Sequence, residues 1–487
     1  MIKLLRLLLC CCLLSRPVLA ELSQSDYVDL VHSNHNQLLW LNQHGVNLPG
    51  MALTSLLADL GIRQSALLSN EELAQPLYTD WLLTQQLLQT DNIVIGHQVE
   101  QDAINLQSLH SAIETGKLTA LVESVLPAFP EVNHLRNAIA GMRRIEALPW
   151  PKLDGIEPPK LGQENDNVSQ IKQVLMLLGD LPANKQNLQR RKIFDPQTIE
   201  AIKGFQYRHG LTPNGRLNQE TLSTLSVPPA EKLVVMQQNL WRWLSLPSLP
   251  PEKYILVNLA EYQLKLVNKN RTQLTMRVVV GKPDSATPVM LTQIDRVTIN
   301  PPWLPPLNIA REELFPMIQE EPKQLSAQGF RWQPRNSGEL LEITQLSPQQ
   351  SAGQFRLIQL PGEHNALGKF RFNITNHDAI YLHDTPAKSF FNREERALSH
   401  GCIRLQHPQL LANALLADEP EQIQQKYKQA LADQETTHFR LSKAIPTYLN
   451  YQTVVANASG KVFWKKDIYQ LDSPPEAGFH QPLLARH

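Results

Sequence analysis

The chain has 487 residues, of which 42% are apolar and 19% charged, and its formal net charge is zero. This length suggests roughly two to four domains, and the composition excludes a disordered chain. A nucleic-acid-binding protein would usually carry a basic excess, so the balanced charge excludes that class.

The first twenty residues have the pattern of a cleavable signal peptide. Lys3 and Arg6 precede an apolar run, and Val18-Leu19-Ala20 fits a cleavage site before Glu21. The run Leu7–Leu14 is short for a bilayer span, which needs about 20 residues. We therefore predict an exported protein without stable membrane insertion; an uncleaved anchor is the alternative.

Removal of this segment leaves a single cysteine, Cys402, because the others are Cys10, Cys11 and Cys12. One thiol permits neither an internal disulfide nor a cysteine-based zinc site. We expect no metal and no cofactor.

Residues 21–160 are predicted to form a helical scaffold domain. Apolar residues recur there at helical spacing, as in Leu53, Leu56, Leu57 and Leu60. The histidines of this region are scattered and have no catalytic spacing.

Residues 161–228 are predicted to form a compact three-helix unit. Asp195 is a candidate N-cap with Pro196 at the first helical position, and Ile199, Ile202 and Phe205 share one face. The unit resembles the peptidoglycan-binding domain of cell-wall enzymes. The matching positions are Leu178-Gly179, Phe205-Gln206, Gly210-Leu211 and Asn214-Gly215. A generic helical linker domain is the alternative.

From residue 250 the apolar period changes to that of β-strands. Residues 254–259, 262–267 and 274–281 predict an antiparallel meander with a turn at 268–270. Strands at 295–300, 368–373 and 379–383 follow, and 407–433 is helical. Residues 308–360 interrupt the strands with helical and polar sequence and are predicted to be an inserted cap. In 435–487, a hairpin at 453–455 and 461–464 is expected to join the same sheet.

Cys402 lies in Ser399-His400-Gly401-Cys402-Ile403-Arg404 and is the candidate nucleophile. Thiol catalysis needs a thiolate, a neighbouring base or cation, and donors for an oxyanion. Gly401 leaves space for a substrate carbonyl. Arg404 is placed to favour the thiolate or to hold a substrate carboxylate; an ordinary salt bridge is the alternative.

Two histidines compete as the base. His400 is two residues before Cys402, and same-face neighbours on a strand are roughly 6–7 Å apart, which is long for direct proton transfer. His383 ends a predicted strand and could approach from a neighbouring one. Spacing alone only slightly favours His383.

His383-Asp384-Thr385, followed at a distance by Ser399-His400-Gly401-Cys402-Ile403-Arg404, resembles the signature of L,D-transpeptidase (YkuD-type) catalytic domains. The order of scaffold, binding unit and capped catalytic domain resembles the large YcbB-like members. The resemblance implies Cys402 as nucleophile and His383 as general base. It places Tyr381, Asp384, Ser399, His400, Gly401 and Arg404 around them. Trp303, between two proline pairs, is a further candidate substrate contact, although a core or cap contact is favoured.

The sequence therefore predicts a multidomain α+β protein with a mostly-β catalytic domain at 250–434. The resemblance implies a periplasmic enzyme that makes 3→3 cross-links between peptidoglycan stem peptides and releases D-Ala. Other cell-wall synthases are candidate partners. The alternatives are an L,D-carboxypeptidase, attachment of protein to peptidoglycan, and a non-catalytic wall-binding scaffold.

Overall fold

The computed structural model describes residues 22–62, 76–94, 104–153, 155–336, 338–433 and 435–472. The predicted signal peptide, with Cys10, Cys11 and Cys12, lies outside these ranges. The described chain divides into two compact units. One comprises residues up to 128 with 243–248, and the other comprises 129–242 with everything from 249 onward.

The first unit is mainly helical, as predicted. Its elements are α1 (Gln24–Ser33), β1 (Leu41–Asn42), β2 (Gly45–Val46), α2 (Leu48–Asp59), α3 (Pro76–Val94), α4 (Leu106–Glu114) and α5 (Leu118–Glu123). Asp80 is buried and accepts hydrogen bonds from the backbone N–H groups of Leu39 and Trp40, both at 2.8 Å. This carboxylate fixes the chain before the small β1–β2 hairpin, which the sequence pattern did not predict.

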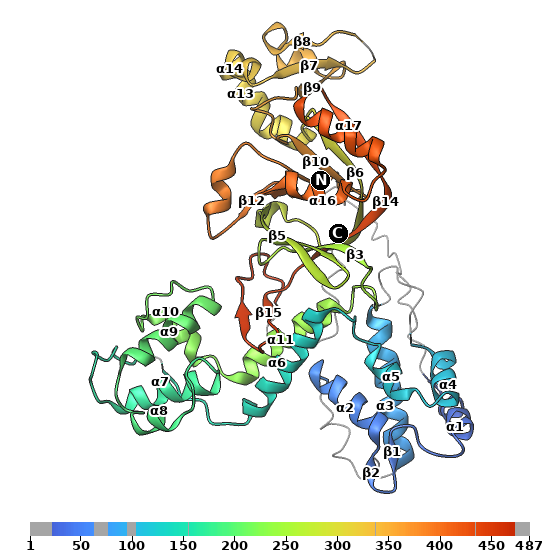
Figure 1. Cartoon of the computed structure of the whole chain (residues 1–487), viewed down its shortest axis with the longest axis vertical. Helices are drawn as coiled ribbons and strands as arrows, with labels where there is room; N and C mark the ends of the chain where they lie inside the picture. The colour runs from blue at the N-terminus through green and yellow to red at the C-terminus, as the bar shows by residue number, and fades with distance from the viewer. Residues whose placement is uncertain are drawn as a thin grey trace, which may run out of the picture. The chain divides into compact units, whose positions relative to one another are not determined.

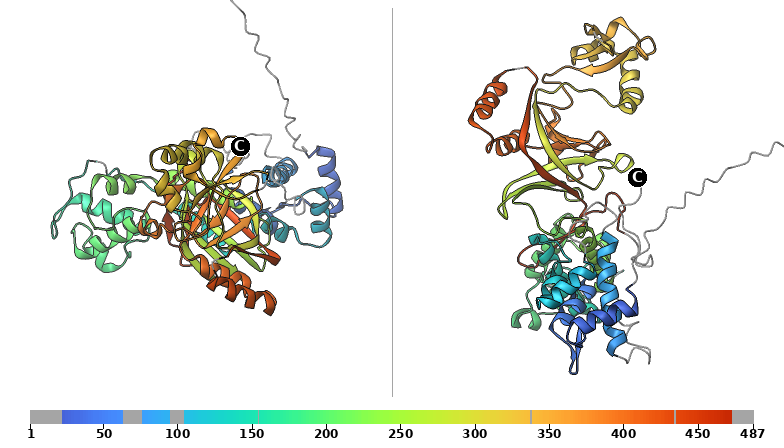
Figure 2. Two further views of the ribbon diagram at one scale, coloured as in Figure 1. Left: turned by 90° about the horizontal axis from the view of Figure 1, so that it is seen from above. Right: turned by 90° about the vertical axis from the view of Figure 1, so that its right-hand side faces the viewer.

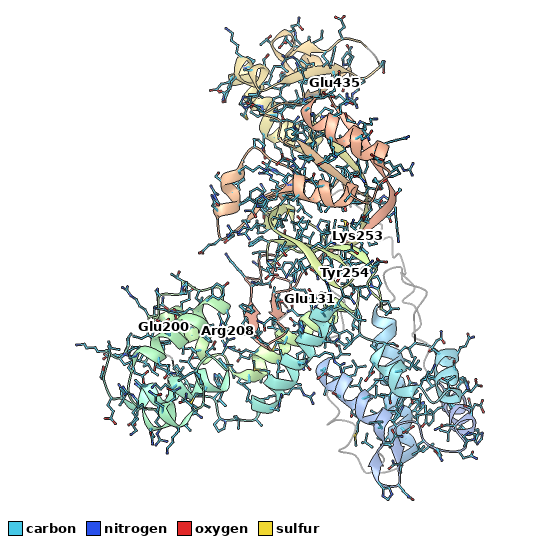
Figure 3. The ribbon with its side chains drawn as sticks, viewed as in Figure 1. Glu131, Glu200, Arg208, Lys253, Tyr254 and Glu435 are labelled. Carbon is cyan, nitrogen blue, oxygen red and sulfur yellow. The ribbon has the colours of Figure 1, made fainter. Side chains whose placement is uncertain are left out.

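The second unit begins with α6 (Pro130–Glu146), so the predicted scaffold boundary at 160 lies inside this unit. Glu131, in the first turn of α6, forms a 3.1 Å ion pair with Lys265 of the nine-stranded sheet. Figure 3 shows Glu131 near Tyr254, whose ring meets Phe129 edge to face. These contacts attach α6 to the sheet.

The peptidoglycan-binding-like unit contains α7 (Asp166–Leu177), α8 (Lys185–Gln189), α9 (Pro196–Arg208) and α10 (Gln219–Ser226) (Figure 1). The short α8 was not predicted. Asp195 caps α9 as expected, accepting the Thr198 N–H at 3.0 Å. The Gln206 side chain binds both Gly215 N–H and Arg216 C=O at 2.8 Å, which holds the turn after α9.

Helix α11 (Pro229–Trp243) leads to the nine-stranded sheet. Its strands are β3 (Lys253–Asn258), β4 (Gln263–Asn268), β5 (Arg271–Gly281), β6 (Met290–Ile299), β10 (Phe370–Ile374), β11 (Tyr381–His383), β12 (Ala397–Ser399), β13 (Ile403–Leu405) and β14 (Thr437–Asn450). Within the described ranges, they pair in the order β12-β5-β13-β11-β10-β6-β14-β3-β4. Because β4 also pairs with β5, the sheet closes into a barrel, whose curvature is visible in Figure 2.

The predicted antiparallel meander of β3, β4 and β5 is confirmed. Lys269 and Asn270 both have positive φ, 51° and 58°, which is typical of a tight two-residue hairpin turn. The rest of the barrel is mixed, because β11 runs parallel to β13 and β14 runs parallel to β3. Helices α16 (Pro408–Leu416) and α17 (Glu421–Ala432) contribute Leu411, Leu415 and Tyr427 to the apolar core of this domain.

The insertion predicted as helical and polar is in part a β-structure, so that expectation is corrected. Strands β7 (Phe330–Pro334), β8 (Leu341–Glu342) and β9 (Phe355–Gln359) pair in the order β8-β7-β9. The helical elements are α12 (Leu307–Ile309), a π-helical turn at Ala310–Leu314, α13 (Phe315–Glu320), α14 (Pro322–Ala327) and α15 (Pro348–Ser351). The insertion has an apolar core of its own, which includes Leu325, Phe330, Trp332 and Ile343.

The expected place of the C-terminal hairpin is also corrected. β14 joins the nine-stranded sheet, but β15 (Val454–Ala456) and β16 (Val462–Trp464) form a separate two-stranded sheet. The hairpin packs near α6 and α9 instead. The Trp464 ring stacks on the His209 ring with centroids 6.0 Å apart, which holds the hairpin against α9.

Candidate active site

Two short parallel strands bring the candidate residues together. In the β11–β13 pair, Leu382 is opposite Ile403 and His383 is opposite Arg404, which sets Tyr381 beside Cys402. Alternate residues of a strand share a face. The side chains of Tyr381, His383, Cys402 and Arg404 therefore lie on one face of the sheet.

The Cys402 thiol is half-buried and donates to a backbone carbonyl. Its sulfur lies 4.0 Å from the Ala379 carbonyl oxygen. Burial raises the thiol pKa, whereas the backbone N–H and hydroxyl of Tyr381 and the charge of Arg404 lower it. Burial is the largest effect, so the thiol is protonated at rest. Its neighbours are arranged to stabilise the thiolate when a base removes the proton.

Trp303 supports this arrangement from the base of the cap. Its side chain interacts with the Tyr381 side chain, which in turn interacts with Cys402. Its backbone N–H and C=O pair with Gln359 at 2.9 and 2.8 Å. The Trp303 ring also meets the Phe330 ring of the cap core. The structure thus places Trp303 in cap contact, where it orients Tyr381.

His383 is 5% exposed and held in one tautomer. Its Nδ1 is hydrogen-bonded to the Asp384 backbone oxygen, which can only accept, so Nδ1 carries the proton and Nε2 keeps a free lone pair. Burial, followed by the charge of Arg404, lowers its pKa from 6.5 to about 3. His383 is consequently neutral at physiological pH and can accept a proton.

Asp384 fixes the chain directly after His383. Its carboxylate accepts the N–H groups of Thr385 at 2.7 Å and Lys369 at 2.9 Å, and it pairs with the Lys388 ammonium at 2.5 Å. The Lys369 contact requires Gly368, because a Cβ there would lie 2.5 Å from Asp384 Oδ2. Asp384 therefore positions the histidine rather than meeting the thiol.

His400 is bound to the cap. Its Nε2 lies 2.7 Å from Glu313 Oε1. Ser399 Oγ donates to the Cys402 carbonyl at 2.6 Å and accepts the Gly401 N–H at 3.2 Å. Gly401 has φ 112°, a conformation that favours glycine. Ser399 and Gly401 shape the loop that presents the thiol.

Arg404 is the remaining predicted site residue. Its guanidinium lies over the Phe390 ring, 5.7 Å from the centroid. Its Nε is buried without a hydrogen-bond partner in the described structure. The alternative, an ordinary salt-bridge role for Arg404, has no support, because none of the ion pairs among the described residues involves it.

Behind the thiol loop lies a supporting network that the sequence did not indicate. Thr287 Oγ1 donates to the Gly401 carbonyl at 2.7 Å and accepts the Gly281 N–H at 2.9 Å. The Tyr469 hydroxyl donates to the Gly281 carbonyl at 2.8 Å and accepts the Thr287 N–H at 3.2 Å. No motif marks Thr287 or Tyr469, because they reach the loop from segments far away in the chain.

Within the described ranges, no group of three His, Cys, Asp or Glu side chains could hold a metal ion. No described helix combines the length and the apolar character needed to cross a bilayer.

Comparisons with known proteins agree with this architecture. Residues 252–423 match the family model of the L,D-transpeptidase catalytic domain (YkuD), and residues 164–225 match the model described as "Putative peptidoglycan binding domain". A Haemophilus influenzae protein named "Putative L,D-transpeptidase" is 33% identical over 220 residues. That match covers 45% of this chain and 44% of the relative, so the chain spans less than half of that protein's length.

Solved structures are more distant. An L,D-transpeptidase from Mycobacterium smegmatis is 12% identical, with a TM-score of 0.19, covering 41% of this chain and 59% of that one. An L,D-transpeptidase (Yku) from Stackebrandtia nassauensis is 14% identical, with a TM-score of 0.21, covering 60% and 97%. TM-scores this low carry no weight for the fold. Residues 252–423 are thus similar to L,D-transpeptidase catalytic domains of the YkuD family, and the segment before them is similar to peptidoglycan-binding domains.

Proposed function

We propose that this protein is a periplasmic L,D-transpeptidase that cross-links peptidoglycan stem peptides through a thioester on Cys402. One observation carries the proposal: Cys402 and a neutral, tautomer-fixed His383 share one face of adjacent parallel strands inside the matched domain. Cys402 is then the nucleophile, His383 is the base, and the Asp384 carbonyl orients that base. Covalent catalysis needs these three roles.

The first step forms the acyl-enzyme. His383 Nε2 takes the thiol proton as Cys402 Sγ attacks the carbonyl of the third stem residue, expected to be diaminopimelate. The C–S bond forms, the C–N bond to the terminal D-Ala breaks, and the proton passes to the departing amine. The Tyr381 N–H and hydroxyl, both bound to the sulfur, stabilise the thiolate as it develops.

The oxyanion of this step needs a backbone donor. We assign it to the Cys402 N–H, because the Gly401 N–H already donates to Ser399. Gly401 contributes by its open space, since a Cβ at this position would meet no atom closer than 3.8 Å.

The second step transfers the acyl group. The side-chain amine of a second stem attacks the thioester, His383 takes the amine proton, and the thiol leaves with that proton. The products are a 3→3 cross-linked dimer and free enzyme. The peptidoglycan-binding domain would keep the catalytic domain near the polymer and raise the local substrate concentration.

The direct test uses the mature protein and a purified disaccharide-tetrapeptide. We expect release of D-Ala and formation of dimers, both abolished by Cys402→Ala. Product masses distinguish the acceptors: a tripeptide product would indicate water and an L,D-carboxypeptidase. Full activity in Cys402→Ala would refute the thioester mechanism.

Comparing His383→Ala with His400→Ala tests the base. Because His400 is bound to Glu313 of the cap, we expect its variant to keep most of the acylation rate, and His383→Ala to lose it by about 100-fold or more. A severe loss confined to His400→Ala would reverse the assignment. A wild-type protein that gains no mass with a carbapenem would favour a non-catalytic wall-binding scaffold.

A further inference from the structure

The face of the sheet that holds Cys402 continues across three more strands. Register places one row of directly opposed residues through His383: Arg404 (β13), His383 (β11), Arg371 (β10), Thr298 (β6) and His438 (β14). A second row runs through Cys402: Cys402, Tyr381, Asn373, Arg296 and Arg440. Both rows lie on one face, because directly opposed residues point to the same side.

Four arginines on this face have no acidic partner. In the described part of the chain, no carboxylate lies within ion-pair distance of Arg296, Arg371, Arg404 or Arg440. Arg371 donates its Nε to Asn373 Oδ1 at 3.1 Å and lies over the Tyr381 ring. Arg404 Nε is buried and lacks a partner. Burial and, with it, the nearby charge of Arg296 lower the pKa of Arg371. Unpaired guanidiniums gathered on one face in this way indicate an anion site.

The ladder of β6 is irregular directly before Arg296. Against β10, Asp295 is the extra residue between Ile294 and Arg296, whereas against β14 the extra residues are 441–444 of β14 itself. Arg296 shares the face of Thr298 and Asn373 by the ordinary alternation of a strand. The irregularity instead turns Ile294 into the barrel core and leaves Asp295 unpaired in the ladder.

We propose that Arg371 and Arg296 bind a carboxylate of the donor stem peptide. The peptide extends from the thiol across β11, β10 and β6. The inference rests on the proposed function and names the substrate feature recognised. Strands are about 4.8 Å apart, so Arg371 is about 10 Å and Arg296 about 14 Å from β13. A peptide spans about 3.5 Å per residue, which places a carboxylate one to three residues from the attacked carbonyl within reach of these side chains.

Two carboxylates of the stem fit this reach: the α-carboxylate of the γ-linked glutamate and the side-chain carboxylate of diaminopimelate. Both offer the planar, bidentate geometry that arginine recognises best. Arg440 is exposed, lies opposite Arg296 on the neighbouring strand β14, and extends the site away from the thiol.

The experiment measures kcat/KM for D-Ala release from three tetrapeptides: the unmodified one, one amidated at glutamate and one amidated at diaminopimelate. We expect one amidation to lower kcat/KM of the wild type by about tenfold or more, since a charge-assisted pair is lost. Arg296→Gln should lose a similar factor on the unmodified peptide and be insensitive to that same amidation.

Arg271→Gln is the matched control, because it removes an equal charge from the exposed β4–β5 turn of the same domain. It should keep wild-type rates and wild-type sensitivity to amidation. Thermal unfolding and alkylation of Cys402 by neutral iodoacetamide report whether Arg296→Gln is folded with an intact thiol site. Arg371→Lys provides a second variant, with the charge kept and the bidentate geometry removed.

Additive losses from amidation and Arg296→Gln, or no loss from either amidation, would overturn the carboxylate site while leaving the proposed reaction standing. If the wild type releases no D-Ala from the unmodified peptide, the proposed function itself fails and this inference fails with it.

Discussion

His383 differs from a histidine in water because its surroundings hold it neutral. Burial and Arg404 lower its pKa to about 3. We therefore expect the rate of Cys402 acylation to show no loss attributable to this histidine between pH 7 and pH 5. Initial rates of acyl-enzyme formation, followed by mass spectrometry across this range, would check it. A titration near pH 6.5 would mean that the base is solvated.

The same shift has a consequence for stability. Because the folded pKa is below the unfolded one, the unfolded chain binds the proton first as the pH falls. The contribution of neutral His383 is present above pH 6.5 and is lost as the pH falls toward 3.

Gly368 offers a second residue-scale prediction. It has φ 58°, and a Cβ would lie 2.5 Å from Asp384 Oδ2. We expect Gly368→Ala to lower the free energy of unfolding by about 1–3 kcal/mol and to slow acylation by displacing Asp384. Urea denaturation and the acylation assay measure the two effects.

Gly204→Ala is the control for that substitution. Gly204 lies within α9, and nothing is within 4 Å of its added Cβ. It should raise the free energy of unfolding by about 0.5–1 kcal/mol. Equal effects of the two substitutions would contradict the proposed role of Gly368.

Among single residues, the sequence predicted the candidate catalytic side chains better than the contacts that hold them in place. The Cys402 and His383 motifs are local, so they can be recognised from spacing. The contacts of His400 with Glu313, of Trp303 with Tyr381, and of Thr287 with Gly401 depend on tertiary structure. Such side chains carry no local signal of a partner that is far away in the chain.

Among the elements, the cap can be perturbed separately from the barrel. Trp332 is 1% exposed in the cap core and donates its indole N–H to the Leu346 carbonyl at 3.1 Å. We expect Trp332→Ala to destabilise the cap by about 3–5 kcal/mol and to expose 307–360 to proteolysis. The barrel should stay folded, as judged by protease resistance of β3 to β5.

Leu340→Ala removes an exposed apolar side chain from the same cap and should leave the proteolysis pattern unchanged. Cleavage throughout the barrel in Trp332→Ala would show that cap and barrel unfold together.

The strands of the barrel were largely predictable because they alternate or run apolar over several residues. The cap strands were not recognised, although Phe330 and Trp332 on β7 and Phe355 and Leu357 on β9 do alternate. Strands β7 and β9 span five residues each and β8 spans two, and alternation over so short a window is a weak signal. The C-terminal hairpin was recognised, but its partner was not, since strand pairing is a property of the fold.

For the molecule as a whole, Lys232 links the binding domain and the C-terminal hairpin. Its ammonium lies 5.9 Å from the Trp464 ring centroid and donates to the Val227 carbonyl at 3.1 Å. Burial, followed by the charge of Arg208, lowers its pKa from 10.5 to about 7. The unfolded chain therefore binds this proton more tightly than the folded one between these values.

We accordingly expect the free energy of unfolding of the wild type to rise from pH 7 to pH 9. The part of this rise that comes from Lys232 should be absent in Lys232→Met. Urea denaturation of both proteins at the two pH values gives the difference. Lys185→Met, on the short helix α8 and without an ion pair in the described structure, should keep the wild-type slope. An identical slope in Lys232→Met would contradict the buried ammonium.

Strand β14 closes the barrel by lying between β6 and β3. Because ribosomes make the chain from its N-terminus, Cys402 and His383 are synthesised before this closing strand exists. A nascent or truncated chain ending near residue 430 would contain the thiol and the histidine but not the barrel that aligns them. Late completion of the fold thus couples the onset of reactivity to the synthesis of β14, so a product that lacks this strand would carry the chemical groups without the ability to modify its surroundings.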